Sequence, residues 1–112
     1  MPITVMTPAR KRQGVSYPAT VTEYSVDIVA GRSIQVYRKG VLAAGFQIGS
    51  EAEYDSFNLS YTGTIKAITD KAVTITKYGQ DHRLNIYEFC WRNWDFNAAE
   101  TAARNAETSM YI

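Results

Sequence analysis

The chain has 112 residues, of which 46% are hydrophobic and 21% are charged, so it can form one domain with its own core but not two. Its formal net charge of +1 excludes an acidic mimic of nucleic acid and a strongly basic nucleic-acid coat protein. No uncharged segment could span a bilayer, no secretory signal is visible, and Cys90 has no second cysteine to pair with. We therefore expect a cytoplasmic protein without a membrane partner.

Residues 1–19 hold all three prolines and show no lasting periodicity, which predicts a flexible arm outside the core. The arm carries Arg10, Lys11 and Arg12, and nine basic and eleven acidic residues remain without them. Three adjacent positive charges can contact the phosphates of a nucleic acid. The predicted organisation is thus a basic arm followed by a single, faintly acidic domain over residues 20–112.

From Thr20 onwards, apolar and polar residues alternate between turn signals, which is typical of half-buried strands. The expected strands cover residues 20–28, 33–38, 41–48, 61–69, 72–77 and 82–89. Gly45 predicts a bulge or a close backbone approach within its strand. Residues 49–61 are ambiguous: Ser50 and Glu53 fit the capping box of a short helix, whereas residues 53–55 fit a strand, which we favour.

The end of the chain changes to helical spacing. Asn97 followed by Glu100 predicts an N-cap and a helix over about residues 98–110. One face of this helix is expected to dock, and it consists of Ala99, Ala102, Ala103, Ala106 and Met110. Glu100 and Arg104 are four residues apart and are expected to form an ion pair on the opposite face.

Two resemblances add to this pattern. Residues 49–89, with Gly49, Tyr54, Gly63-Thr64-Ile65 and the alternating apolar residues up to Ile86, resemble an SH3-like small barrel of the KOW type. That resemblance implies a binding module and not an enzyme. The fold class expected is mainly β (α+β): a small SH3-like barrel or an antiparallel sheet, with one C-terminal helix.

The second resemblance is carried by residues 53–58 and 91–96, which resemble segments of small phage-encoded proteins. Some small phage proteins antagonise host defence by binding a host complex or by sequestering a signalling nucleotide. The resemblance therefore implies a ligand of one of those classes, bound in the cytoplasm of a host cell.

No catalytic motif is present: the chain has no glycine-rich phosphate loop, no nucleophile elbow and no HExxH sequence. Cys90 lies between Phe89 and Trp91 and is expected to be a buried, inert thiol. His82 is expected to be a solvated residue at a turn. One histidine and one cysteine do not make a conventional zinc site, so we expect no metal, no cofactor and no enzymatic activity.

Residues 89–96 hold both tryptophans and two of the four phenylalanines. We favour a core segment that joins the sheet to the helix, with a recognition surface as the alternative, and the two can coexist because alternate residues can point to opposite sides. On such a surface an exposed tryptophan stacks on a base, an arginine pairs with phosphate or carboxylate, and an asparagine reads polar edges. The candidate ligand-binding residues are Trp91, Arg92, Asn93, Trp94, Arg83 and Tyr54.

The leading hypothesis is a non-enzymatic binding protein, with a nucleotide, a nucleic acid or a host protein complex as its ligand. One alternative is an SH3-like nucleic-acid-binding module that uses the basic arm together with Arg83 and Arg92. The other alternative is an assembly protein that associates with itself through sheet edges and the alanine face, and we expect a homo-oligomer on these grounds. Tyr54, Tyr61, Tyr78 and Tyr87 near strand ends favour an interface, although sheets also favour tyrosine.

Overall fold

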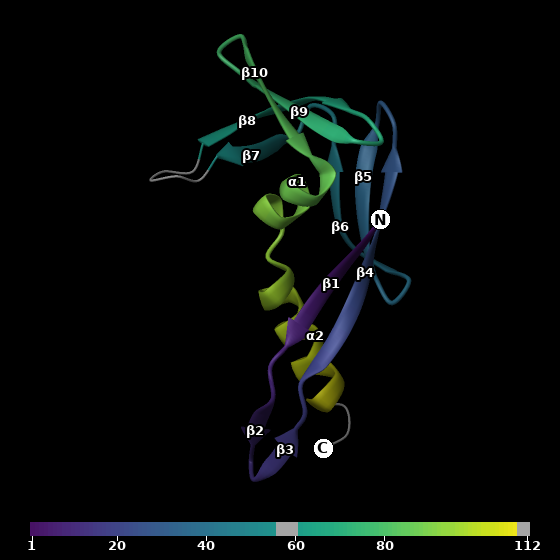
Figure 1. Ribbon diagram of the computed structural model, residues 1–112, viewed down its shortest axis with the longest axis vertical. Helices are drawn as coiled ribbons and strands as arrows, with labels where there is room; N and C mark the ends of the chain where they lie inside the picture. Colours follow the sequence, from purple (N-terminus) through teal and green to yellow (C-terminus); the bar gives the residue numbers. More distant parts are fainter. Residues whose placement is uncertain (56–60, 110–112) are drawn as a thin grey trace.

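The computed structural model describes residues 1–55 and 61–109 and confirms a mainly β, α+β fold with a C-terminal helix (Figure 1). The strands are β1 (Pro2–Thr7), β2 (Arg10–Arg12), β3 (Val15–Tyr17), β4 (Thr20–Val29), β5 (Ser33–Arg38), β6 (Val41–Gln47), β7 (Glu51–Asp55), β8 (Tyr61–Ile68), β9 (Ala72–Lys77) and β10 (Gln80–Asn85). The helices are α1 (Ile86–Asn93) and α2 (Phe96–Ser109). The strand favoured over residues 53–55 is confirmed as part of β7.

Two four-stranded antiparallel sheets form the body, with the strand orders β1-β4-β5-β6 and β10-β9-β8-β7. The hairpins are tight because Lys39-Gly40 and Tyr78-Gly79 both have two consecutive positive φ angles, 50° and 80° in the first pair, 51° and 77° in the second. This geometry matches the twist of a two-residue hairpin, and glycine adopts it without steric cost. The predicted turn over residues 78–81 is therefore shorter than expected, and β10 begins at Gln80.

The prediction of a flexible arm over residues 1–19 is wrong for the residues that form β1. This strand pairs with β4, and Ile3 and Val5 are each only 1% exposed within the core. The alternation of Ile3 and Val5 is too short to predict a strand between two prolines. Pro2 is nevertheless compatible with β1, because proline is tolerated at the first position of an edge strand. The basic residues 10–12 form β2, whose hairpin with β3 lies at the lower end of the molecule in Figure 1.

The glycine that strand packing requires is Gly63 in the second sheet, and not Gly45. A bulge is present in β6 as predicted, but it lies at Ala43, which is skipped between the pairs Val36–Ala44 and Tyr37–Leu42, whereas Gly45 pairs regularly with Gln35. At Gly63, by contrast, a Cβ atom would lie 2.5 Å from the backbone oxygen of Thr76. Only glycine fits this close approach of β8 to β9.

The second sheet curls until its two edge strands come into contact. Tyr54 on β7 stacks on His82 of β10, with ring centroids 3.9 Å apart and ring planes 10° apart. The prediction that His82 is a solvated turn residue is wrong, because this side chain is half-buried within β10.

The strand predicted over residues 82–89 is also wrong beyond Asn85. The Asn85 side chain caps α1 by accepting a hydrogen bond of 2.7 Å from the backbone N–H of Glu88. Ile86, Phe89 and Cys90 then follow at helical spacing and are all buried. Leu84 and Ile86 are two residues apart, as inward-facing residues of a strand are. The sequence therefore does not reveal that the apolar spacing changes from that of a strand to that of a helix after Asn85.

Helix α2 is present as expected but starts earlier and docks through a different face. Asp95, and not Asn97, caps it by accepting a hydrogen bond of 2.9 Å from Ala98 N–H. Glu100 is 1% exposed, whereas Ala102 and Ala106 are exposed, so the expected orientation of the helix is wrong. Met110 of the predicted docking face lies outside the described residues.

A single core joins the two sheets and the two helices. Phe46 of β6 packs edge-on against Phe89 of α1 with centroids 5.1 Å apart, and Tyr24 of β4 packs likewise against Phe96 of α2 at 5.2 Å. The helices form a continuous column beside the first sheet (Figure 1). Over the described residues, neither helix has the length and apolar composition that a membrane crossing needs.

Candidate functional site

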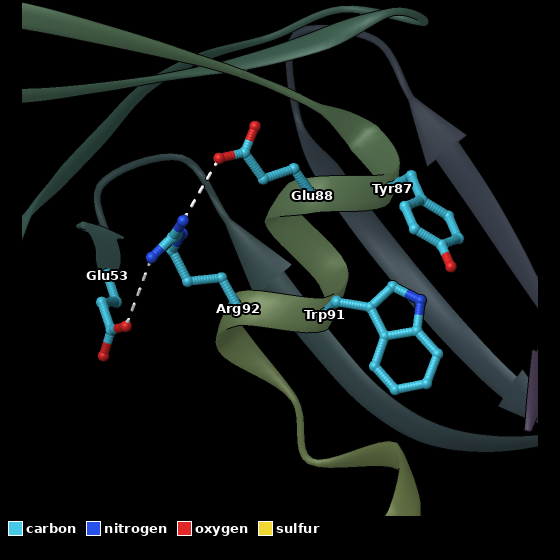
Figure 2. A pocket seen from close by; sticks show the side chains of 5 residues that line it. All are labelled: Glu53, Tyr87, Glu88, Trp91 and Arg92. Carbon is cyan, nitrogen blue, oxygen red and sulfur yellow. Dashed lines mark hydrogen bonds and ion pairs between the residues drawn. The ribbon is translucent and has the colours of Figure 1, made fainter. Parts of the chain in front are cut away.

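The outward face of α1 is the candidate binding site. Because Ile86, Phe89 and Cys90 point into the core, Tyr87, Glu88, Trp91 and Arg92 lie on the opposite side of the helix. Together with Glu53 of β7 these four line an open hollow of about 520 Å³ (Figure 2). We refer to these five residues as the α1 surface.

The charged half of the α1 surface holds one guanidinium between two carboxylates. Arg92 lies 3.2 Å from Glu88 and 3.9 Å from Glu53, and Figure 2 shows it between them. Two negative charges against one positive charge leave a formal charge of −1. This side of the hollow therefore favours a cationic ligand and opposes an anionic one.

The aromatic half lies on the other side of the helix axis (Figure 2). Tyr87 is 55% exposed, and its ring centroid lies 6.2 Å from that of the half-buried Trp91. Trp91 in turn contacts the buried Phe96, with centroids 4.7 Å apart. The aromatic pair is thus supported from the core side while part of its area faces solvent.

The structure brings Trp91 and Arg92 together at this surface but places the other four candidates elsewhere. Arg83 is exposed on β10, Tyr54 is stacked on His82, and Trp94 follows α1 and packs against the core. The basic triplet lies in the β2–β3 hairpin, at the opposite end of the molecule from β8 and β9 (Figure 1).

Comparisons place no known protein beside this chain. No family model, no curated protein and no solved structure matches it. The SH3-like and phage-protein resemblances therefore stay predictions, and residues 56–58 of the second resemblance lie outside the described part.

Sequence reasoning missed Tyr87, Glu88 and Glu53 as members of the site. The helical spacing of Ile86, Phe89, Cys90 and Asn93 would have revealed α1 and its outward face. No local signal identifies Glu53, because it reaches Arg92 only through the packing of β7 against α1.

Asn93 ties α1 to the edge of the second sheet. Its Oδ1 accepts a hydrogen bond of 2.7 Å from the backbone N–H of Glu53, and its Nδ2 donates to the Glu53 carbonyl at 3.1 Å. The same Nδ2 is 3.1 Å from the carbonyl oxygen of Phe89. The side-chain amide therefore makes the hydrogen bonds that a neighbouring strand would make. It occupies the backbone N–H and carbonyl of Glu53 at the free edge of β7.

Replacing Asn93 by alanine is expected to lower the free energy of unfolding by about 1–3 kcal/mol, because the Glu53 backbone groups lose their partners. Urea denaturation measures this change, and the matched control is Asn97→Ala, which removes an exposed asparagine with an expected effect within about 0.5 kcal/mol. Unchanged stability in Asn93→Ala would instead support the recognition role considered from the sequence.

Cys90 is buried, as the sequence predicts. Burial raises the pKa of its thiol to about 11, so the nucleophilic thiolate is scarce at neutral pH. Among the residues with described positions, no three His, Cys, Asp or Glu side chains gather as a metal site would require.

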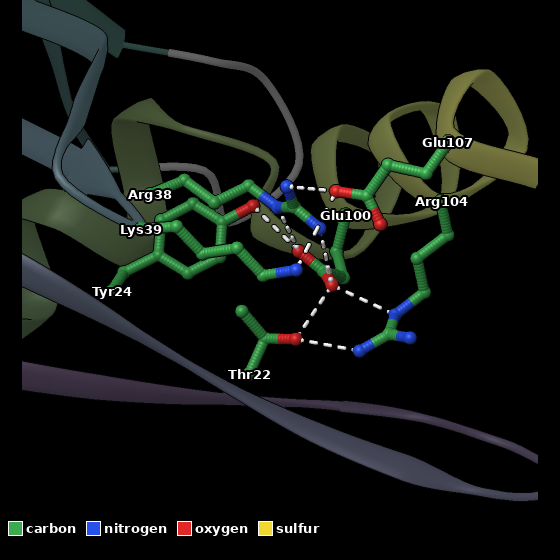
Figure 3. Close-up of polar contacts among 7 residues, drawn as sticks. All are labelled: Thr22, Tyr24, Arg38, Lys39, Glu100, Arg104 and Glu107. Carbon is green, nitrogen blue, oxygen red and sulfur yellow. Dashed lines mark hydrogen bonds and ion pairs between the residues drawn. The ribbon is translucent and has the colours of Figure 1, made fainter. Parts of the chain in front are cut away.

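A second polar cluster, centred on Glu100, holds α2 against β4 and β5 (Figure 3). The carboxylate accepts hydrogen bonds from Thr22 at 2.6 Å, from Tyr24 at 3.0 Å and from Arg38 Nε at 2.7 Å. Arg104 Nε lies 2.8 Å from it, which confirms the ion pair expected from the sequence. We call this set the Glu100 cluster.

The electrostatics of the Glu100 cluster favour an ionised carboxylate. Burial by itself raises the pKa of Glu100, but the hydrogen bonds from Arg38, Thr22 and Tyr24 outweigh it and lower the pKa to about 2. Burial, together with the hydrogen bond to Glu100, raises the pKa of the Tyr24 hydroxyl to about 12. Because the donors are already directed at Glu100, we assign this cluster to structure and not to ligand binding.

A smaller hollow of about 110 Å³ adjoins this cluster, lined by residues that include Tyr17, Thr20 and Arg104. The Thr20 hydroxyl is buried there and has no hydrogen-bond partner within the described chain. A volume of this size suits ordered water molecules, which commonly satisfy such groups.

Proposed function

We propose that this chain is a non-catalytic binding protein that holds a basic side chain of a protein partner on the α1 surface. The observation that carries the proposal is the combination of Tyr87 and Trp91 with two carboxylates around a single guanidinium. An arginine or lysine from a partner can lie over an aromatic face and pair with Glu88 or Glu53.

The same geometry argues against a nucleotide or nucleic acid at this surface. A phosphate close to Arg92 would also approach Glu88 and Glu53, whose charges are not compensated by other residues lining the hollow. Of the three ligand classes considered from the sequence, a protein complex fits best. An antagonist of host defence would act in this way, and that part of the proposal rests on the phage-protein resemblance alone.

The proposal can be tested with a nonapeptide of arginine, titrated at low salt while tryptophan fluorescence and heat are recorded. Cation–π contacts contribute about 0.5–2 kcal/mol each, so Trp91→Ala is expected to weaken binding by about 2–30-fold. Tyr78→Ala is the matched control, because Tyr78 is 93% exposed at the tip of a distant hairpin and its loss should leave binding unchanged.

Arg92→Ala distinguishes a basic peptide ligand from a nucleotide, because it should change the affinity for the two in opposite directions. It removes the positive charge from the α1 surface, so it should strengthen binding of the arginine peptide. A nucleotide site would lose its ligand on the same change. Binding of ATP or of a single-stranded oligonucleotide that Arg92→Ala abolishes, without binding of the peptide, would overturn the proposal.

A further inference from the structure

We infer that β6 pairs edge to edge with β6 of a second copy of this chain, so that the first sheet continues across a two-fold symmetric dimer. This goes beyond the proposed function, since β6 lies in the other sheet and contributes no residue to the α1 surface. The inference comes from comparing the four edge strands of the two four-stranded sheets, which are β1, β6, β7 and β10.

Three of the four edges have blocked backbone groups or charged side chains, as edges of soluble proteins usually do. Strand β1 begins with Pro2, which has no N–H to donate, and it contacts α2. The Asn93 amide occupies backbone groups of β7, which also carries Glu51, Glu53 and Asp55. Strand β10 carries Asp81 and Arg83. Each of these features opposes the addition of another strand.

Strand β6 has neither kind of protection. Its seven residues, Val41–Gln47, include no charged side chain, and Val41 and Leu42 are 69% and 57% exposed. Within residues 1–55 and 61–109, the backbone groups of residues 41–46 form no hydrogen bond outside the first sheet. An uncharged edge with free backbone groups is a template for another strand.

The first half of β6 is bent by the register shift opposite Val36 and Tyr37, whereas Ala44–Gln47 pairs regularly with β5. Antiparallel pairing centred on Gly45 uses this regular half and sets Ala44 of one copy opposite Phe46 of the other. It also brings the exposed Leu42 of each copy to the level of the partner's Ile48, which is 41% exposed.

A second copy fits this edge better than a foreign strand. Self-pairing usually brings identical charges together, but here no charge is present to repel. A charged peptide would find no complementary group along β6, whereas the apolar side chains match their own copies. A two-fold axis also closes the contact, because each β6 edge is used once.

The test is light scattering over a range of concentrations, combined with Gly45→Lys and Gly45→Thr. The 12.6 kDa chain should shift to twice this mass as concentration rises. Gly45 tolerates a side chain, because the nearest atom to a Cβ there is the Ile34 backbone oxygen at 4.0 Å. Gly45→Lys places like charges opposite one another and should weaken dimerisation at least tenfold, whereas Gly45→Thr should keep the dimer.

Circular dichroism should show that both variants fold, and Gly45→Lys should still bind the arginine peptide with unchanged affinity. This readout separates failure of the dimer from failure of the proposed α1 surface. A monomer at every concentration would overturn the inference, and so would a dimer that Gly45→Lys leaves intact. A monomer that instead captures an unrelated uncharged strand peptide at β6 would overturn self-pairing in favour of a foreign partner.

Discussion

Replacing Glu100 by alanine is expected to lower the free energy of unfolding by about 3–5 kcal/mol, which is a large share of the stability of a small domain. The carboxylate is 1% exposed and accepts hydrogen bonds from Thr22, Tyr24 and Arg38. Its removal leaves the Arg38 guanidinium, whose side chain is 14% exposed, without the buried one of its two carboxylate partners. Urea denaturation followed by circular dichroism measures the loss.

Glu107→Ala is the matched control for this change. Glu107 also pairs with Arg38 at 2.7 Å, but its side chain is 43% exposed, so solvent screens the pair. Its loss should cost less than about 1 kcal/mol. Equal effects of the two substitutions would show that burial of Glu100 contributes nothing, and would contradict the structural role of the Glu100 cluster.

The pH dependence of stability should carry the signature of the same group. The folded-state pKa of Glu100 is about 2, below its ordinary value of 4.5, so the folded state holds the proton less tightly than the unfolded state does. The stabilisation is therefore complete above about pH 5 and is lost as pH falls towards 2. Glu100→Gln should flatten the stability profile in this window, and an unchanged profile would refute the assignment.

Removal of residues 1–7 is expected to abolish cooperative folding or to lower the free energy of unfolding by at least about 3–6 kcal/mol. Ile3 and Val5 are each 1% exposed, and burying such side chains contributes about 1.5–3 kcal/mol apiece. The deletion also uncovers the paired edge of β4. Thermal and urea denaturation of the shortened chain give the result.

Point variants keep this prediction testable if the shortened chain does not fold. Ile3→Ala should cost about 2–5 kcal/mol, because it leaves a cavity in the core. Met6→Ala, on the same strand but 70% exposed, should change stability by less than about 0.5 kcal/mol. Similar effects of Ile3→Ala and Met6→Ala would show that β1 is not docked in solution.

The exposed face of α1 shows that a run of neighbouring residues in the sequence does not by itself define the chemistry of a site. Trp91 and Arg92 were expected together because they are neighbours in the chain, but consecutive residues of a helix do not face each other, and in α1 the two lie in different halves of the surface (Figure 2). The chemistry they offer depends on Glu53, which reaches Arg92 from another element. With that contact, an arginine expected to pair with phosphate or carboxylate becomes part of a surface with a formal charge of −1.

The sequence alone determined the features that depend on neighbouring residues. Period-two alternation located β5 and β9 with correct bounds, and X-Gly pairs located the hairpin turns, because strand pleat and turn geometry are local properties. Tertiary structure decided the rest. Docking of β1, the start of α1 at Ile86 and burial of Glu100 all depend on partners distant in the chain, whose packing and hydrogen bonds outweigh weak local preferences.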